Sequence, residues 1–146
     1  MSRCVDCWPE DGSKPDLELY YNSDWFDNTI LAEKGPDHQV ATYETPLVVN
    51  GKTDPVADRV GVLTISEFLT KNTYIDTFSI ILQNGSITFI DDEITTDNSS
   101  LWGPNKVLPF RIVSGARDYL FVKGYVVVVT DENNGRILQF YFGKHD

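Results

Sequence analysis

The sequence predicts an all-β domain of antiparallel strands, and three observations support this fold class. Short runs rich in Val, Ile, Thr and aromatic residues recur along the chain, as is typical of strands. Tight-turn signals separate several of these runs, namely the Asn-Gly pairs at residues 50–51, 84–85 and 134–135. No segment has the apolar spacing of an amphipathic helix.

Eight runs have the composition and length of strands. They cover residues 17–22, 39–49, 59–69, 74–82, 86–95, 106–113, 125–130 and 136–142. Residues 23–38 are expected to form a loop whose large apolar side chains pack onto the domain, either as a lid over a barrel mouth or as an anchored crossover. Eight antiparallel strands can close into a barrel or stack as a sandwich, and periodicity alone leaves both open.

Length and composition fit one folded domain. The chain has 146 residues, of which 41% are hydrophobic and 12% aromatic, enough to fill a core. The net charge of −10 argues against a nucleic-acid partner or an anionic membrane surface. No apolar run approaches the ~20 residues needed to span a bilayer, and no signal peptide is recognisable at the N-terminus. We therefore expect a polar leader at residues 1–16, a single domain at residues 17–146, and a cytoplasmic protein.

Metal and cofactor chemistry has little support in the sequence. Cys4 and Cys7 form one Cys-x-x-Cys pair, and the only histidines are His38 and His145, whereas a closed zinc site needs about four ligands. We interpret the cysteines as incidental or as a local disulfide. No phosphate-binding glycine loop is present, so no metal and no cofactor are expected.

Residues 112–125 predict a corner between two strands. Gly115 and Gly124 suit tight backbone angles, and the segment between them carries Asp118 and Lys123. This segment is either a plain structural turn, or a loop in which Asp118 and Lys123 face each other and present charge to a pocket.

The same stretch carries a family resemblance. Residues 114–119 and 122–125 resemble the Gly-Gly-Thr-Gly-x-Phe-x-x-Ala-Arg-Gly segment of dirigent proteins, and the matching segment of allene oxide cyclases and bacterial spirotetronate cyclases. Lys123 stands where dirigent proteins usually carry Arg, and Arg117 replaces a glycine. Residues 43–47 with 58–61 are similar to the dirigent Asp-x-Pro-Leu and Val-Gly-Arg pattern, and residues 59–64 to the Arg-Val-Gly-Ile-Thr of allene oxide cyclase.

The resemblance favours an eight-stranded antiparallel up-and-down β-barrel over a sandwich. It implies a cavity for a small apolar substrate and a homo-oligomer, either a dimer or a trimer. By the resemblance Asp24 (or Ser23 in its place), Asp118 and Lys123 would surround the cavity mouth, where they polarise a carbonyl or steer a proton. Glu44 falls on the acid of the Asp-x-Pro-Leu pattern and is a further candidate catalytic residue. The alternative for the charged residues among them is a set of surface ion pairs of small energetic value.

Aromatic residues are expected to form the cavity walls, and one carboxylate to enter the cavity. Because strand side chains alternate, Asp91 shares a face with Phe89, whereas the alternative places residues 91–93 at the solvent-exposed end of a strand. A carboxyl inside an apolar barrel has a raised pKa and can act as a general acid. The expected substrate-contacting residues are Tyr20, Tyr43, Phe89, Asp91, Trp102, Tyr125 and Phe140.

These observations lead to three hypotheses for function. The first is a cofactor-free cyclase or isomerase of secondary metabolism, in which the cavity folds an unsaturated substrate and fixes its stereochemistry. The second is a dirigent-type protein that orients radical coupling, and the third is a non-catalytic binding barrel.

Overall fold

The chain folds as a closed β-barrel with one additional strand. The structure, a computed structural model, describes residues 14–26, 28–70, 74–91 and 107–143. Its strands are β1 (Leu17–Asn22), β2 (Asn28–Lys34), β3 (His38–Val49), β4 (Gly61–Thr70), β5 (Tyr74–Leu82), β6 (Gly85–Ile90), β7 (Val107–Arg117), β8 (Lys123–Thr130) and β9 (Gly135–Gly143), with a 3₁₀ turn, η1 (Ser23–Trp25), after β1. No helix among the described residues is long and apolar enough to cross a membrane.

Eight of the nine strands form the ring. The strand order is β1-β9-β8-β7-β6-β5-β4-β3-β2, and a further pairing of β1 with β3 closes it. All of these pairings are antiparallel. The predicted eight-stranded up-and-down barrel is therefore confirmed, with β2 as an extra strand on the edge of β3.

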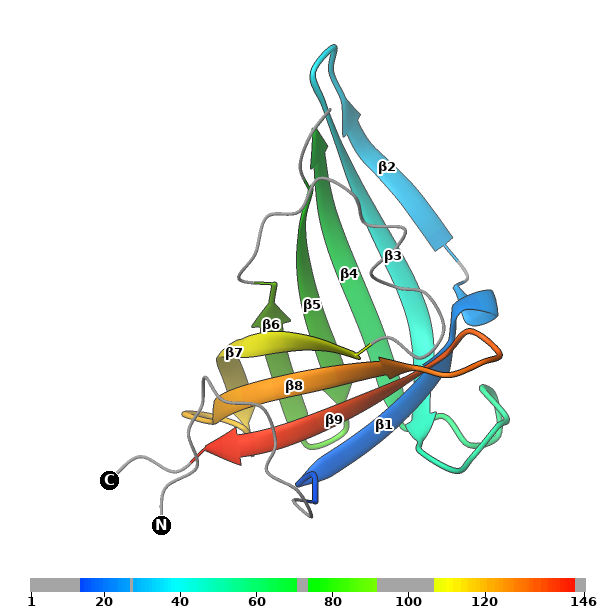
Figure 1. The fold of residues 1–146 in the computed structure, drawn as a ribbon, viewed down its shortest axis with the longest axis vertical. Helices are drawn as coiled ribbons and strands as arrows, with labels where there is room; N and C mark the ends of the chain where they lie inside the picture. The colour runs from blue at the N-terminus through cyan, green and yellow to red at the C-terminus, as the bar shows by residue number, and fades with distance from the viewer. Residues whose placement is uncertain (1–13, 27, 71–73, 92–106, 144–146) are drawn as a thin grey trace.

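The segment at residues 23–38 differs from the expected loop. β1 pairs with β3 only through Leu19↔Val49 and Tyr20↔Val48, and β2 then continues along β3 in the same antiparallel sense. The two strands thus share one edge of β3 in succession, with η1 between them (Figure 1). The long strands β3, β4 and β5 extend beyond the rest of the barrel toward the β2–β3 hairpin (Figure 1).

Side chains fill the middle of the barrel. The rings of Phe78 and Phe89 stack with centroids 5.0 Å apart, and Phe110 packs edge-on against Phe78 at 4.9 Å. Phe140 packs edge-on against Phe89 at 5.7 Å. Phe78, Phe89 and Phe140 are fully buried in the inner cluster. Phe89 and Phe140, expected as cavity walls, are therefore core residues at the centre of the barrel.

A second apolar cluster lies on the outer side of β8 and β9. Tyr125, Val127 and Tyr141 form it, and the Tyr125 and Tyr141 rings stack at 5.1 Å. Tyr125 alternates along β8 with Val126 and Val128 of the inner cluster, so its side chain points away from the interior. The expectation that Tyr125 lines the cavity is wrong for this geometric reason.

The predicted corner at residues 114–116 is instead the end of β7. β7 continues to Arg117 and absorbs an extra residue near Val113, where its register with β6 shifts between Thr88 and Phe89. A Cβ on Gly115 would collide with the backbone oxygen of Tyr119, so close approach, not a turn conformation, requires glycine there. Gly124 does adopt a positive φ of 142°, as its predicted corner role demands.

Candidate functional site: an acidic end of the barrel

Two carboxylates on neighbouring strands face the barrel interior near one end. Glu67 follows Ile65 at the two-residue spacing of one strand face, and Asp76 precedes Phe78 at the same spacing. Glu67 and Asp76 are directly paired across β4 and β5, and their side chains are hydrogen-bonded. Asp76 is only 3% exposed. The result is an acid pair enclosed by a mostly apolar core.

A hydrogen bond between two carboxyl groups requires a proton on one of them. Burial is the largest cause that raises the pKa of Asp76, and the charge of Glu67, its hydrogen bond and the charge of Asp91 follow in that order; together they raise this pKa to about 8. With its pKa raised to about 8, Asp76 is in its acid form at neutral pH. This is the state in which a carboxyl group can donate a proton while its neighbour accepts one.

Tyrosines surround the acid pair. The Tyr43 hydroxyl donates to Glu67 Oε1 at 3.3 Å, and burial, together with Glu67, raises the pKa of Tyr43. Tyr21 is 3% exposed, and burial raises its pKa well above the ordinary value, with Arg136 opposing and Asp76 reinforcing the shift. Both phenols therefore remain neutral hydrogen-bond donors in the physiological pH range.

Phe26 fills the position where β1 and β3 separate. Its ring packs edge-on against Tyr21 at 5.7 Å and against Tyr43 at 5.9 Å, and it contacts the inner cluster. The segment after β1 is therefore anchored by an aromatic side chain over the gap beside the acid pair. The apolar side chain of Phe26 therefore packs onto the domain, as expected for this segment.

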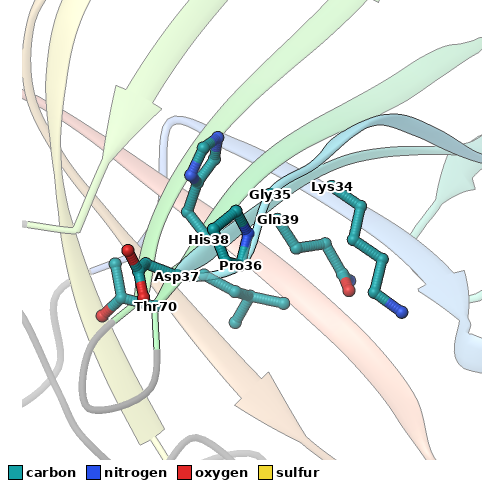
Figure 2. Close-up of a pocket in the computed structure, with 8 residues that line it drawn as sticks. Lys34, Gly35, Pro36, Asp37, His38, Gln39 and Thr70 are labelled. Atoms are coloured by element: carbon teal, nitrogen blue, oxygen red, sulfur yellow. The ribbon is translucent and has the colours of Figure 1, made fainter.

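An open groove lies beyond the acid pair, at the start of β3 and the end of β4. It has a volume of about 580 Å³ and is lined by Lys34, Gly35, Pro36, Asp37, His38, Gln39, Leu69 and Thr70. Gln39 pairs with Leu69, and the next pair on the same strand face is Ala41 with Glu67. Figure 2 shows the side chains of Lys34 and Gln39 extending in one direction and the His38 ring in another. Since alternate residues of a strand are about 7 Å apart, the groove ends close to the acid pair.

One oxygen of the acid pair, Asp76 Oδ1, is fully buried. Asp76 Oδ1 is inaccessible to solvent and has no hydrogen-bond partner among the described residues. A buried, unsatisfied oxygen costs about 1–3 kcal/mol, and such groups are found where a ligand or an ordered water completes the site. The side chains described hold no group of three or more His, Cys, Asp or Glu suited to a metal ion.

The predicted site residues divide between the two ends and the outer face. Tyr43 lies at the acid pair, and Asp91 is close enough to act on Asp76 electrostatically. Asp24 lies in η1, after β1, at this same end of the barrel. Asp118 and Lys123 flank the β7–β8 turn, and in an up-and-down barrel the strand polarity places this turn at the opposite end.

The expected ring of Asp24, Asp118 and Lys123 around one mouth is therefore wrong. Asp118 and Lys123 are exposed, and no ion pair joins them within the part of the chain that the structure describes. Glu44 is exposed and lies on the outer side of β3, because it alternates with Tyr43 and Thr45, which face inward. Tyr20 points to the outer side of β1 and packs edge-on against Trp25 at 5.6 Å. Trp102, Cys4 and Cys7 lie outside the described residues.

The fold and the site define a small antiparallel β-barrel with an acidic, partly open end. No protein-family model and no curated protein sequence matches the chain. Among solved structures, the chain is similar to a pyocyanin demethylase, with a TM-score of 0.55 and 19% sequence identity over 84% of this chain and 97% of that one. At this identity the similarity extends to the barrel fold alone.

Proposed function

We propose that the chain is a cofactor-independent isomerase or cyclase that moves a proton within a small unsaturated molecule bound at the acidic end of the barrel. The observation that carries this proposal is the buried Glu67–Asp76 pair. A fold that needed only stability would gain by replacing two buried carboxyl groups with apolar side chains. Retaining them inside the core is the arrangement expected of acid–base catalysis.

The chemistry follows from the single proton that the pair holds. Asp76 in its acid form donates this proton to one atom of a conjugated or carbonyl-containing substrate. The resulting cation then loses a proton from a neighbouring carbon to the carboxylate pair, so that a double bond shifts or a ring closes and the enzyme regains its proton. Tyr43 stabilises the charge on Glu67 through its hydrogen bond.

The surroundings of the pair indicate the substrate's shape. The stacked rings of Phe78 and Phe89 form an apolar floor next to the acid layer, and such a surface favours flat, unsaturated molecules. The unpartnered Asp76 Oδ1 favours a substrate that also carries an N–H or O–H donor. The name of the structurally similar protein, a demethylase of pyocyanin, supports a small organic molecule as the ligand of this barrel.

The dirigent-type alternative has less support from the geometry. Its resemblance depends on residues 43–47 and 112–125, yet Glu44 points outward and Asp118 and Lys123 lie at the far end from the acid pair. A purely non-catalytic carrier would need no proton on a buried carboxyl group. We therefore retain proton-transfer catalysis as the principal proposal.

Proton exchange tests the proposal even though the natural substrate is unidentified. The protein is incubated in D₂O with a panel of small β,γ-unsaturated ketones and flat N-heteroaromatic enones, and deuterium incorporation and double-bond migration are followed by ¹H NMR. We expect catalysed exchange with the wild-type protein, a rate that falls as the pH rises through about 8, and loss of at least 100-fold in Asp76→Asn. Binding without exchange, or equal exchange in the variant, would support the carrier role instead.

A further inference from the structure

Three side chains form one wall of the groove beyond the acid pair. Gln39 pairs with Leu69 on β4 and with Lys34 on β2, so the three share one face of the sheet. Gln39 also alternates in phase with Tyr43, whose hydroxyl donates to Glu67, so this face continues into the barrel interior. All three residues line the groove, and Figure 2 shows the side chains of Lys34 and Gln39 extending in the same direction.

Lys34 supplies a positive charge to this wall. It is the only lysine or arginine in the described strands β2, β3, β4 and β5, and it is exposed to solvent. No carboxylate among the residues that the structure describes forms an ion pair with it. Its ammonium group therefore keeps its donors for a ligand that enters the groove.

Gln39 complements Lys34 in the recognition of a carboxylate. The two residues are direct cross-strand partners, and the Cβ atoms of such a pair lie about 5 Å apart. One carboxylate can therefore accept a charge-assisted hydrogen bond from the lysine ammonium and a second hydrogen bond from the glutamine amide. One lysine and one amide match the single charge of a carboxylate better than the higher charge of a phosphate group.

The distance between this wall and the acid pair corresponds to a small molecule. The pair Lys34–Gln39 lies one step of the same face beyond the pair Ala41–Glu67, and Lys34 and Glu67 are two strands apart. With strands about 4.8 Å apart and alternate residues about 7 Å apart, the Cα atoms of Lys34 and Glu67 are separated by roughly 12 Å. Leu69 follows Glu67 on the same face, so the path between the two polar sites has an apolar side chain on it.

The nearby acidic groups do not exclude an anion from the groove. Burial raises the pKa of Asp76, so this residue is in its neutral acid form at pH 7, and the Tyr43 hydroxyl donates to Glu67. The separation from Glu67 also exceeds the screening length of about 8 Å at physiological salt. Asp37, on the turn between β2 and β3, lies on the side of the hairpin away from the Lys34 ammonium group (Figure 2).

We propose that Lys34 and Gln39 bind a carboxylate group of the substrate, and that the substrate of this barrel is a small unsaturated carboxylic acid. Its carboxylate lies in the groove, its apolar part packs on Leu69, and its unsaturated end meets the acid pair. This inference rests on the proposed function for what happens at the acid pair, whereas the carboxylate site can be tested without it. Lys34 and Gln39 determine specificity and take no part in the proton transfer.

Isothermal titration calorimetry tests the site with trans-styrylacetic acid, a flat β,γ-unsaturated acid, and with its methyl ester. The wild type should bind the acid roughly 10-fold more tightly than the ester, because only the acid offers a charged acceptor to Lys34. Lys34→Met should reduce this preference to about 1, whereas Lys34→Arg should retain most of it. Lys52→Met is the matched control, since Lys52 is exposed beyond the other end of β3, and it should keep the full preference.

Two further measurements separate charge recognition from a general effect on the fold. Raising NaCl from 50 to 500 mM should weaken binding of the acid but not of the ester. Gln39→Leu should lower the preference for the acid several-fold, because it removes the amide donor and keeps a side chain of similar size. Thermal unfolding of each variant checks that the barrel persists.

The deuterium-exchange assay, run in parallel, distinguishes failure of this site from failure of the proposed function. A wild type that prefers the acid through Lys34 but catalyses no exchange would support the carboxylate site and count against proton transfer. Equal binding of acid and ester by the wild type, binding of neither, or a preference that survives Lys34→Met would overturn the carboxylate site, whatever the exchange assay shows.

Discussion

Replacing Asp76 with Asn should stabilise the protein at neutral pH, although it removes a residue proposed to act in catalysis. Asp76 has a pKa of about 8 in the folded chain against an ordinary value of 3.8. Between these two values the folded state binds a proton that the unfolded state has released. The free energy of unfolding therefore falls as the pH rises through this window, and the loss is complete above about pH 8.

The magnitude follows from the distance between pH 7 and the unfolded pKa. At pH 7 the solution is about three pH units above the pKa of Asp76 in the unfolded chain. Keeping Asp76 protonated in the folded chain therefore costs about 4 kcal/mol, at roughly 1.4 kcal/mol per unit. Residual solvent screening reduces this value, so we expect Asp76→Asn to gain roughly 2–4 kcal/mol at pH 7. The Asn side-chain N–H can replace the carboxyl proton in the hydrogen bond to Glu67.

Urea unfolding followed by tryptophan fluorescence at pH 4, 5.5, 7 and 8.5 measures the difference. The difference in the free energy of unfolding between Asp76→Asn and the wild type should be near zero at pH 4 and should increase up to about pH 8. Asp54→Asn is a control with the opposite sign. Asp54 accepts hydrogen bonds from the backbone N–H of Val56 and Ala57, and these lower its pKa, so its removal should cost stability only above the acidic range.

A difference between the wild type and Asp76→Asn that is independent of pH would refute the reasoning. So would a variant that is less stable than the wild type at pH 7 and above. Either result would mean that the acid pair is not held in a singly protonated state by its burial.

Three further predictions concern the barrel and the acid pair. Phe78→Ala should lower the free energy of unfolding in urea by about 3–5 kcal/mol, because Phe78 is 2% exposed at the centre of the stacked rings. Phe121→Ala is the same change at an 86% exposed position, and it should alter the free energy of unfolding by no more than about 0.5 kcal/mol. Gly124→Ala should prevent stable folding or lower the melting temperature by more than roughly 10 °C, because the added Cβ would meet the Tyr141 carbonyl. Gly51 also has a positive φ, but a Cβ there would meet no atom within 4 Å. Gly51→Ala should therefore lower the free energy of unfolding by only about 1 kcal/mol. Tyr43→Phe removes the donor to Glu67 Oε1, so it should raise the apparent pKa of the acid pair and shift the falling limb of any pH–rate profile to higher pH.

The strand pattern is largely predictable from the sequence because it depends on local composition. The run at Tyr74–Leu82 has the same bounds in the structure, and closure into a ring agrees with the expected barrel. β2 is not predicted, because its residues show weak alternation and form a strand only through pairing with β3. The expected end of β7 at Val113 is wrong, since Ser, Gly and Ala resemble a corner in sequence, whereas the pairing of β7 with β6 continues to Arg117.

The acid pair follows from the sequence if one argument is extended. Alternation places Asp91 on the inner face with Phe89, and Asp91 does act on Asp76. The same alternation of strand side chains places Glu67 on one face with Leu63 and Ile65, and Asp76 on one face with Phe78. What the sequence cannot supply is the register of β4 with β5, which makes these two carboxyl groups direct neighbours.

The resemblance-based residues fail for a different reason. Motifs give a position along the chain, but strand polarity decides at which end of the barrel each position lies. Asp24 and the Asp118–Lys123 turn are therefore on opposite ends, despite their joint appearance in the family pattern.

The central claim, that a buried carboxyl pair holds one proton at neutral pH, is tested most directly by ¹³C NMR titration of the aspartate side chains. Comparison with Asp76→Asn assigns the Asp76 carboxyl signal. The account predicts that this signal titrates with a midpoint near pH 8, with Glu67→Gln lowering the midpoint. A midpoint near 4 in the folded protein would contradict it.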